Sequence, residues 1–285
     1  MTLSDNHTPY FPLDDVEIRR VPKTRTITEP LYSNNWMSIN EREFFMQVDG
    51  VGKFYANDGK LVEYAPAVKA SVSTIELYMN GSVFGAILHQ RQILPIHGSS
   101  FVKGGRGFII SGESGAGKSS LTTAFCLNGD DFLTDDVTPI EFINEEPQIL
   151  PYSDRIKLWE DSLKQLQKEA DPLKKIMPDE EKFYFPVKRT HSEKIPLKAL
   201  FIIEPKEIQK TNIQPVEKIM AIPALQNQIY RYWFLAGIPH LKELYFHKLA
   251  SIGRQIPVFQ VERPLKISIS EMHHLMDDYI KKELL

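Results

Sequence analysis

The 285-residue sequence contains a single cysteine, Cys126, and no long uninterrupted apolar run. One thiol cannot form an intramolecular disulfide or a zinc site, which favours a reducing compartment. A membrane helix needs about 18 to 20 apolar residues. Residues 1–7 have neither the basic nor the apolar segment of a secretion signal. We therefore expect a soluble, cytoplasmic protein without a membrane partner.

The sequence also lacks a large excess of charge of either sign. The chain has 34 Lys and Arg against 37 Asp and Glu, and a formal net charge of -3 at pH 7. Dedicated nucleic-acid binders normally show a basic excess, so we expect no nucleic-acid partner. Hydrophobic residues make up 42% and charged residues 25%, close to the averages of globular proteins, which excludes wholesale disorder.

The sequence pattern divides the chain into three parts. Residues 1–16 are polar and contain proline, which predicts a flexible arm. Residues 17–66 hold short β-like runs, and Asp58-Gly59 between two of them predicts a hairpin. Residues 67–285 alternate strand-like and helical patterns, which predicts an α/β domain.

Periodic apolar residues locate the main elements of the third part. A spacing typical of a buried helix runs over 71–90, and compact apolar runs at 93–96 and 107–111 predict two strands. Helical spacing returns over 119–127 and over 222–236.

The segment after the run 107–111 carries the strongest motif. It matches G-x-x-x-x-G-K-[ST] over Gly112, Glu113, Ser114, Gly115, Ala116, Gly117, Lys118 and Ser119. In such loops the backbone N–H groups surround a phosphate, the lysine reaches the β- and γ-phosphates, and the hydroxyl ligates Mg²⁺. The alternative is a flexible glycine-rich loop, but chance supplies this pattern in roughly one chain in a hundred of this length. We predict that these residues, together with Ser120, bind a nucleotide and magnesium.

Two adjacent carboxylates, Asp135 and Asp136, follow the short apolar run 132–134. Phosphoryl transfer needs a metal clamp and a group that accepts the proton of the nucleophile, and carboxylates serve both purposes. The alternative is a solvated acidic turn. The position after a phosphate loop and an apolar strand favours the functional interpretation.

Two further side chains are ambiguous on their own. His97 ends the apolar run 94–96, where a histidine with a structural hydrogen bond is the simpler interpretation. Arg155 would neutralise charge on a transferring phosphate or form a surface ion pair, and the sequence does not decide between the two.

From residue 44 to the C-terminus the chain resembles the C-terminal domain of HPr kinase/phosphorylase, and more closely its shorter HPr-kinase-like relatives. The resemblance implies an α/β, P-loop-containing, HPr-kinase-like fold, here with an N-terminal β-rich extension. It implies that His97 is the active-site histidine and that Asp136 is the proton acceptor. Asp135 would then be the adjacent carboxylate at the metal, with Ser119 as the magnesium-binding serine.

Other segments refine the resemblance. Residues 154–159, Asp-Arg-Ile-Lys-Leu-Trp, are similar to an Arg-Leu-x-Leu-Trp segment of the short relatives, which are associated with serine phosphorylation on peptides. The chain has Ser120 where the bifunctional enzymes carry Glu, and it lacks their Arg-Gly-Leu-Gly segment. We therefore expect kinase activity with little phosphorylase activity.

The leading hypothesis is a cytoplasmic, bacterial-type kinase that uses ATP and Mg²⁺ to phosphorylate a serine hydroxyl of a peptide or protein. Its catalytic residues would be Asp136, His97, Lys118 and Asp135, with Ser119 and Asp135 at the metal. A small-molecule kinase and a nucleotide-dependent switch without transfer activity are the alternatives. The sequence leaves open the acceptor, the preferred nucleotide and whether the protein forms a homo-oligomer.

Overall fold

A computed structural model describes residues 9–177, 180–188 and 190–285. Of the arm predicted over 1–16, residues 1–8 lie outside this description. Within the described residues, no helix is both long and apolar enough to cross a membrane.

Contacts between residues divide the chain into two compact units. The first holds the chain up to Pro95 together with Tyr230–Phe246, and the second holds Ile96–Ile229 and His247–Leu285. Each unit combines helices with β-sheet, so the protein belongs to the mixed α/β class.

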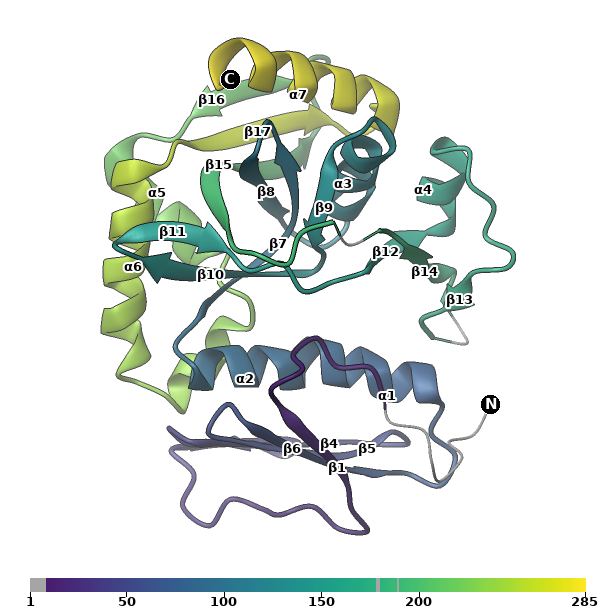
Figure 1. Cartoon of the computed structure of the whole chain (residues 1–285), viewed down its shortest axis with the longest axis vertical. Coiled ribbons are helices and arrows are strands. Elements are labelled where there is room, and N and C mark those ends of the chain that lie inside the picture. The colour runs from purple at the N-terminus through teal and green to yellow at the C-terminus, as the bar shows by residue number, and fades with distance from the viewer. Residues whose placement is uncertain (1–8, 178–179, 189) are drawn as a thin grey trace. The chain divides into compact units, whose positions relative to one another are not determined.

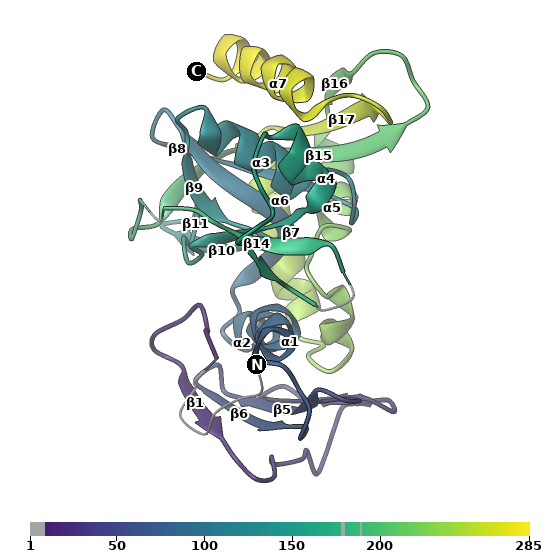
Figure 2. The same ribbon diagram turned by 90° about the vertical axis from the view of Figure 1, so that its right-hand side faces the viewer.

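The first unit contains a six-stranded sheet in the order β1-β6-β5-β4-β3-β2, in which β1 is parallel to β6 and the other pairs are antiparallel. Figure 1 shows α1 and α2 lying along one face of this sheet, and Figure 2 shows the same helices end-on. The elements are β1 (Glu17–Arg20), β2 (Tyr32–Ser33), β3 (Met37–Ile39), β4 (Glu43–Val48), β5 (Gly52–Asn57), β6 (Leu61–Pro66), α1 (Val72–Tyr78), the π-helical turn η1 (Met79–Val83), α2 (Phe84–Gln90) and the 3₁₀ helix η2 (Tyr232–Ala236).

The predicted hairpin and the predicted helix of this unit are both confirmed. Asp58 and Gly59 connect β5 to β6 with φ values of 51° and 67°, the left-handed conformation that such a turn requires. The helix predicted over 71–90 is formed by α1, η1 and α2, and the Ser71 side chain caps its start by accepting a hydrogen bond from the Thr74 N–H.

The two units do not follow the predicted division into 17–66 and 67–285, because the long helix belongs with the N-terminal sheet. Gln90 at the end of α2 donates to the Ala56 carbonyl (3.2 Å) and accepts from the Gly59 N–H (2.8 Å). These hydrogen bonds hold the helix to the β5–β6 hairpin, a long-range pairing that helical periodicity does not reveal.

The second unit is built on an eight-stranded sheet. Its order is β11-β10-β7-β8-β15-β17-β16, with β9 paired to β7, and β8 and β17 both run parallel to the central β15. A separate three-stranded sheet has the order β12-β14-β13. The elements are β7 (Leu94–Lys103), β8 (Arg106–Gly112), α3 (Lys118–Leu127), β9 (Asp131–Thr134), β10 (Val137–Ile143), β11 (Glu146–Ile149), β12 (Arg155–Trp159), α4 (Glu160–Gln165), β13 (Lys174–Lys175), β14 (Lys182–Pro186), β15 (Ile195–Lys206), β16 (Asn212–Pro215), α5 (Lys218–Gln226), α6 (Leu241–Gln255, from residue 247 on), β17 (Val258–Pro264) and α7 (Ile269–Glu283).

Aromatic packing fixes α3 on this sheet. Phe125 of α3 stacks on Phe101 of β7 at 4.1 Å between ring centroids, and the same buried cluster contains Phe108, Phe201 and, from α7, Met276. Fully burying one such side chain stabilises the fold by about 1.5–3 kcal/mol. Leu121 and Ala116 belong to the same cluster, so the start of α3 is packed against this core as well.

The small sheet has an apolar and a polar face because side chains alternate along a strand. Ile156 and Leu158 of β12 are buried in a cluster next to α3. Their neighbours Arg155, Lys157 and Trp159 point to the other side. One face of β12 is therefore anchored in the core, and the opposite face carries basic and aromatic side chains.

The helix predicted over 222–236 is wrong. α5 ends at Gln226, Ile229 forms a β-bridge with Ile96, and η2 starts only after Arg231, which has a φ of 54°. The Gln228 carbonyl accepts from the His97 N–H of β7, and the Tyr230 N–H donates to the Pro95 carbonyl of the same strand. Periodicity carries no signal for such a pairing.

Candidate functional site

The loop over residues 112–119 connects β8 to α3 in a conformation that needs its glycines. Gly112 has a φ of +136°, and a Cβ atom there would lie 2.3 Å from the Ile203 carbonyl oxygen of β15. Gly115 and Gly117 have φ values of +85° and +100°. α3 begins at Lys118, so its first N–H groups have no acceptor within the helix and its positive end faces the loop.

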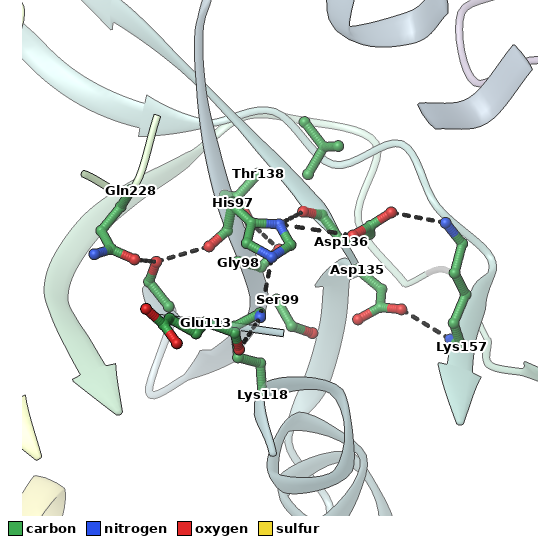
Figure 3. A network of polar contacts seen from close by, with 12 residues as sticks. His97, Gly98, Ser99, Glu113, Lys118, Asp135, Asp136, Thr138, Lys157 and Gln228 are labelled. Carbon is green, nitrogen blue, oxygen red and sulfur yellow. Dashed lines mark hydrogen bonds and ion pairs between the residues drawn. The ribbon is translucent and has the colours of Figure 1, made fainter. Parts of the chain in front are cut away.

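The Lys118 ammonium is held by the loop and by His97. Its Nζ donates to the carbonyl oxygens of Gly112 and Glu113, each at 2.9 Å, and lies 3.1 Å from His97 Nε2 (Figure 3). Burial lowers the pKa of Lys118, while the carboxylates of Asp136 and Asp135 raise it. The cation is therefore positioned by fixed backbone and ring acceptors.

His97 on β7 joins the lysine to the carboxylate pair. Its Nδ1 lies 3.0 Å from the Asp136 carbonyl oxygen, which can only accept, so Nδ1 carries the proton. Nε2 then accepts from the Lys118 ammonium. Burial lowers the pKa of His97 in spite of the nearby Asp136 carboxylate, in agreement with this neutral tautomer.

Asp135 is buried and has one oxygen without a partner. Its Oδ2 accepts from the Lys157 backbone N–H at 2.8 Å, whereas Oδ1 has no hydrogen-bond partner among the described residues. Burial raises the pKa of Asp135, and the Lys157 N–H and the nearby Ser119 hydroxyl lower it. A buried carboxylate oxygen without a hydrogen-bond partner, near a serine hydroxyl, suits a hard divalent cation such as Mg²⁺.

Asp136 is the accessible member of the pair, with 29% of its side chain exposed. It adopts a left-handed conformation, φ 70°. Its Oδ2 accepts from the Lys157 ammonium at 2.8 Å, and its Oδ1 is 3.7 Å from His97 Nδ1. Burial would raise the pKa of Asp136, but the Lys157 ammonium holds it well below its usual value. The carboxylate is therefore ionised at neutral pH.

Buried hydroxyl groups fix the turn that carries the two carboxylates. Thr134 Oγ1 lies 2.6 Å from Ser100 Oγ and 2.7 Å from Thr138 Oγ1, and Thr138 donates to the Gly98 carbonyl oxygen at 3.1 Å. These bonds connect both sides of the turn to β7, the strand of His97. The histidine and the carboxylates therefore keep a defined spacing.

Most of the predicted site residues line one cavity of about 240 Å³. The cavity is bordered by the loop from Ser114 to Ser120, by His97 and by Asp136. Other walls come from the small sheet and α4, and from the chain between the end of β17 and the start of α7. They include Lys157, Trp159, Ser162, Gln165, Lys182, Arg263, Leu265, Ile267 and Ile269.

Gly112, Glu113, Asp135 and Arg155 do not border the cavity, and Ser120 borders it but contacts α4. Gly112 and Glu113 contribute carbonyl oxygens to Lys118. Ser120 Oγ lies 2.8 Å from Ser162 Oγ of α4. The Arg155 guanidinium lies over the Tyr184 ring at 5.0 Å.

Lys157 and Arg263 are site residues that sequence reasoning did not identify. Lys157 pairs with Asp136, and Arg263 Nε donates to the Ala116 carbonyl oxygen of the loop at 2.9 Å. The alternation of polar and apolar residues over 155–159 was the available signal for Lys157. It predicts the face of the strand but not the carboxylate that the face meets.

No protein-family model matches the sequence, and no curated protein matches it. Among solved structures, the HPr(Ser) kinase/phosphatase from Coxiella burnetii is similar to 66% of this chain and to 93% of its own, with 15% sequence identity and a TM-score of 0.34.

Proposed function

We propose that the protein is a kinase that transfers the γ-phosphate of ATP to a serine hydroxyl of a peptide or protein. The observation that carries the proposal is a single cavity bordered by a glycine loop with its lysine and by an accessible, ionised carboxylate. Lys118 and Asp136 are joined through His97, so the cation and the carboxylate belong to one network.

The phosphate chain of ATP would bind along the loop and the first turn of α3. Free N–H groups at a helix N-terminus bind phosphate oxygens, and Lys118 adds a full positive charge. Arg263 supports the loop, because its guanidinium donates to the Ala116 carbonyl oxygen. A nucleotide phosphate would thus meet donors that are already fixed.

Ser119 and Asp135 are the residues that would hold Mg²⁺. The described part of the chain has no group of three or more His, Cys, Asp or Glu that could form a complete metal site. Mg²⁺ usually binds one or two protein oxygens together with substrate phosphates. When bound, the ion supplies charge neutralisation to the phosphate oxygens.

Asp136 would accept the proton of the attacking serine hydroxyl. The serine oxygen forms a bond to the γ-phosphorus, the bond to ADP breaks, and the proton passes to the Asp136 carboxylate. A carboxylate with a lowered pKa is a weak base, but in a loose phosphoryl-transfer transition state the nucleophile needs mainly to be oriented. Lys157 keeps Asp136 ionised and in place for this role.

Two alternatives use the same nucleotide site. A small-molecule kinase would differ only in its acceptor, and a nucleotide-dependent switch would bind ATP without transfer. The exposed carboxylate favours an enzyme, because a switch does not require a group that orients a hydroxyl. We favour peptide serine as the acceptor because residues 154–159 resemble a segment of the short HPr-kinase-like proteins.

A labelling experiment separates the three. The protein is incubated with Mg²⁺ and γ-labelled ATP, with a serine-containing peptide library, with a panel of hydroxylated metabolites, or alone. Label on peptide serine is the expected result. Label on a metabolite only would replace the protein acceptor by a small molecule, and nucleotide binding without label in any product would favour the switch.

The pH dependence of the reaction should reveal His97. Its pKa lies below 6.5, so the ring is neutral at pH 7 and takes up a proton only at a lower pH. Protonation would turn Nε2 from an acceptor into a cation 3.1 Å from the Lys118 ammonium. We therefore expect kcat to fall as the pH drops below the ordinary histidine pKa of about 6.5.

Replacing His97 by Gln removes the titrating group. The variant should have a lower kcat that is nearly constant between pH 5 and 7. His240 is half-exposed and lies outside the cavity, so His240→Gln should show the same fall of kcat at acid pH as the wild type. If kcat of His97→Gln still falls at acid pH, the fall is due to another titrating group.

A further inference from the structure

Trp159 is a large apolar side chain that remains 46% exposed at the end of β12. It borders the cavity next to the phosphate loop, and the Lys182 ammonium lies 5.1 Å from its ring centroid. Lys182 is also its direct partner on β14. An aromatic ring that is supported from behind by a sheet and left open to a cavity is suited to stacking.

Trp159 lies away from the reacting carboxylates. It follows Lys157, which contacts Asp136, by two residues on the same strand face, a separation of about 7 Å. The next element, α4, meets the first turn of α3 through Ser162 and Ser120. Because the γ-phosphate of ATP would be at Asp136, the nucleoside end would extend toward this other side of the cavity.

The groups around Trp159 on that side match a nucleobase. Gln165 Oε1 accepts from the Ile269 N–H at 3.1 Å, so the side-chain NH₂ is the group that remains to donate. Leu265, which is 56% exposed, and Ile267 provide an apolar wall on the segment before α7. An aromatic face, an apolar wall and one amide donor are the usual means of holding a flat heterocycle.

We propose that Trp159 stacks on the base of a purine nucleotide and that Gln165 donates to an acceptor on its edge. This inference rests on the proposed function and assigns the residues that select the nucleotide. A purine is favoured over a pyrimidine because its larger ring covers more of the indole. An acceptor peptide docked on Trp159 is the competing occupant. In that case Trp159→Ala would raise the KM for peptide and leave the affinity for ATP unchanged.

The first measurement compares ATP with inorganic triphosphate, which has the phosphates but no base. Trp159→Ala should weaken binding of ATP by about 5- to 150-fold, the range found for loss of base–aromatic stacking, and leave binding of triphosphate unchanged. Trp159→Phe should restore most of the ATP affinity. Calorimetry at fixed Mg²⁺ gives both constants.

The second measurement uses the indole itself as the probe. The remaining tryptophans, Trp36 and Trp233, lie in the first unit and do not border the cavity. After both are replaced by Phe, ATP and GTP should quench the emission of Trp159 strongly, CTP and UTP weakly, and triphosphate not at all.

The subsite proposal is overturned if Trp159→Ala leaves ATP affinity unchanged, weakens triphosphate equally, or raises only the KM for peptide. Failure of both ATP and triphosphate to bind the wild-type protein would overturn the proposed function, and the subsite with it. ATP binding that is indifferent to Trp159 would overturn the subsite alone.

Discussion

Replacing Lys118 by Ala is expected to reduce phosphoryl transfer by at least about 10³-fold while the protein stays folded. Its ammonium contacts two loop carbonyls and His97, and the apolar clusters around Phe125 and Ile156 do not contain this residue. The substitution therefore removes a charge at the phosphates but no core packing. Steady-state kinetics and thermal unfolding of the same preparation test both statements.

Lys164→Ala is the matched control for this experiment. Lys164 is 65% exposed on α4, pairs with Glu160 and does not border the cavity. Its removal should leave turnover unchanged. Near-wild-type turnover of Lys118→Ala would contradict the assignment of the phosphate loop.

Asp136→Asn is expected to lower kcat by at least about 10²-fold with ATP still bound. The amide keeps the shape of the side chain but cannot accept the serine proton, and its ion pair with Lys157 is lost. Because Asp136 does not lie in the glycine loop, nucleotide affinity should change little. The expected pattern is thus a loss in kcat with a nearly constant dissociation constant for ATP.

Asp154→Asn gives the corresponding control for charge. Asp154 is 56% exposed and pairs with Arg155 at 3.5 Å, and it does not border the cavity. The turnover of Asp154→Asn should match that of the wild type. If Asp136→Asn also turns over normally, the proton acceptor has to be Asp135, His97 or solvent.

Features that depend on neighbours in the sequence were predictable. The Asp58-Gly59 turn requires a left-handed backbone at both residues, and the helix over 71–90 follows from the helical spacing of its apolar residues. The glycine loop is likewise a local pattern, since its conformation depends on Gly112, Gly115 and Gly117.

Features that depend on distant partners were not predictable. Lys157 lies 21 residues after Asp136, and only the packing of the small sheet against α3 brings the ammonium to the carboxylate. Ile229 leaves the helical pattern because it pairs with Ile96. The same applies to the division of the chain, since Gln90 joins the long helix to the N-terminal hairpin.

The most direct test of the central claim follows one reaction mixture by ³¹P NMR, with ATP, Mg²⁺ and the best serine peptide. The γ-phosphate signal is expected to disappear while ADP and a phosphoserine monoester form in equal amounts, and Asp136→Asn is expected to slow the formation of both products. ADP accompanied only by inorganic phosphate, or a phosphoserine signal that forms equally fast in Asp136→Asn, would contradict the central claim.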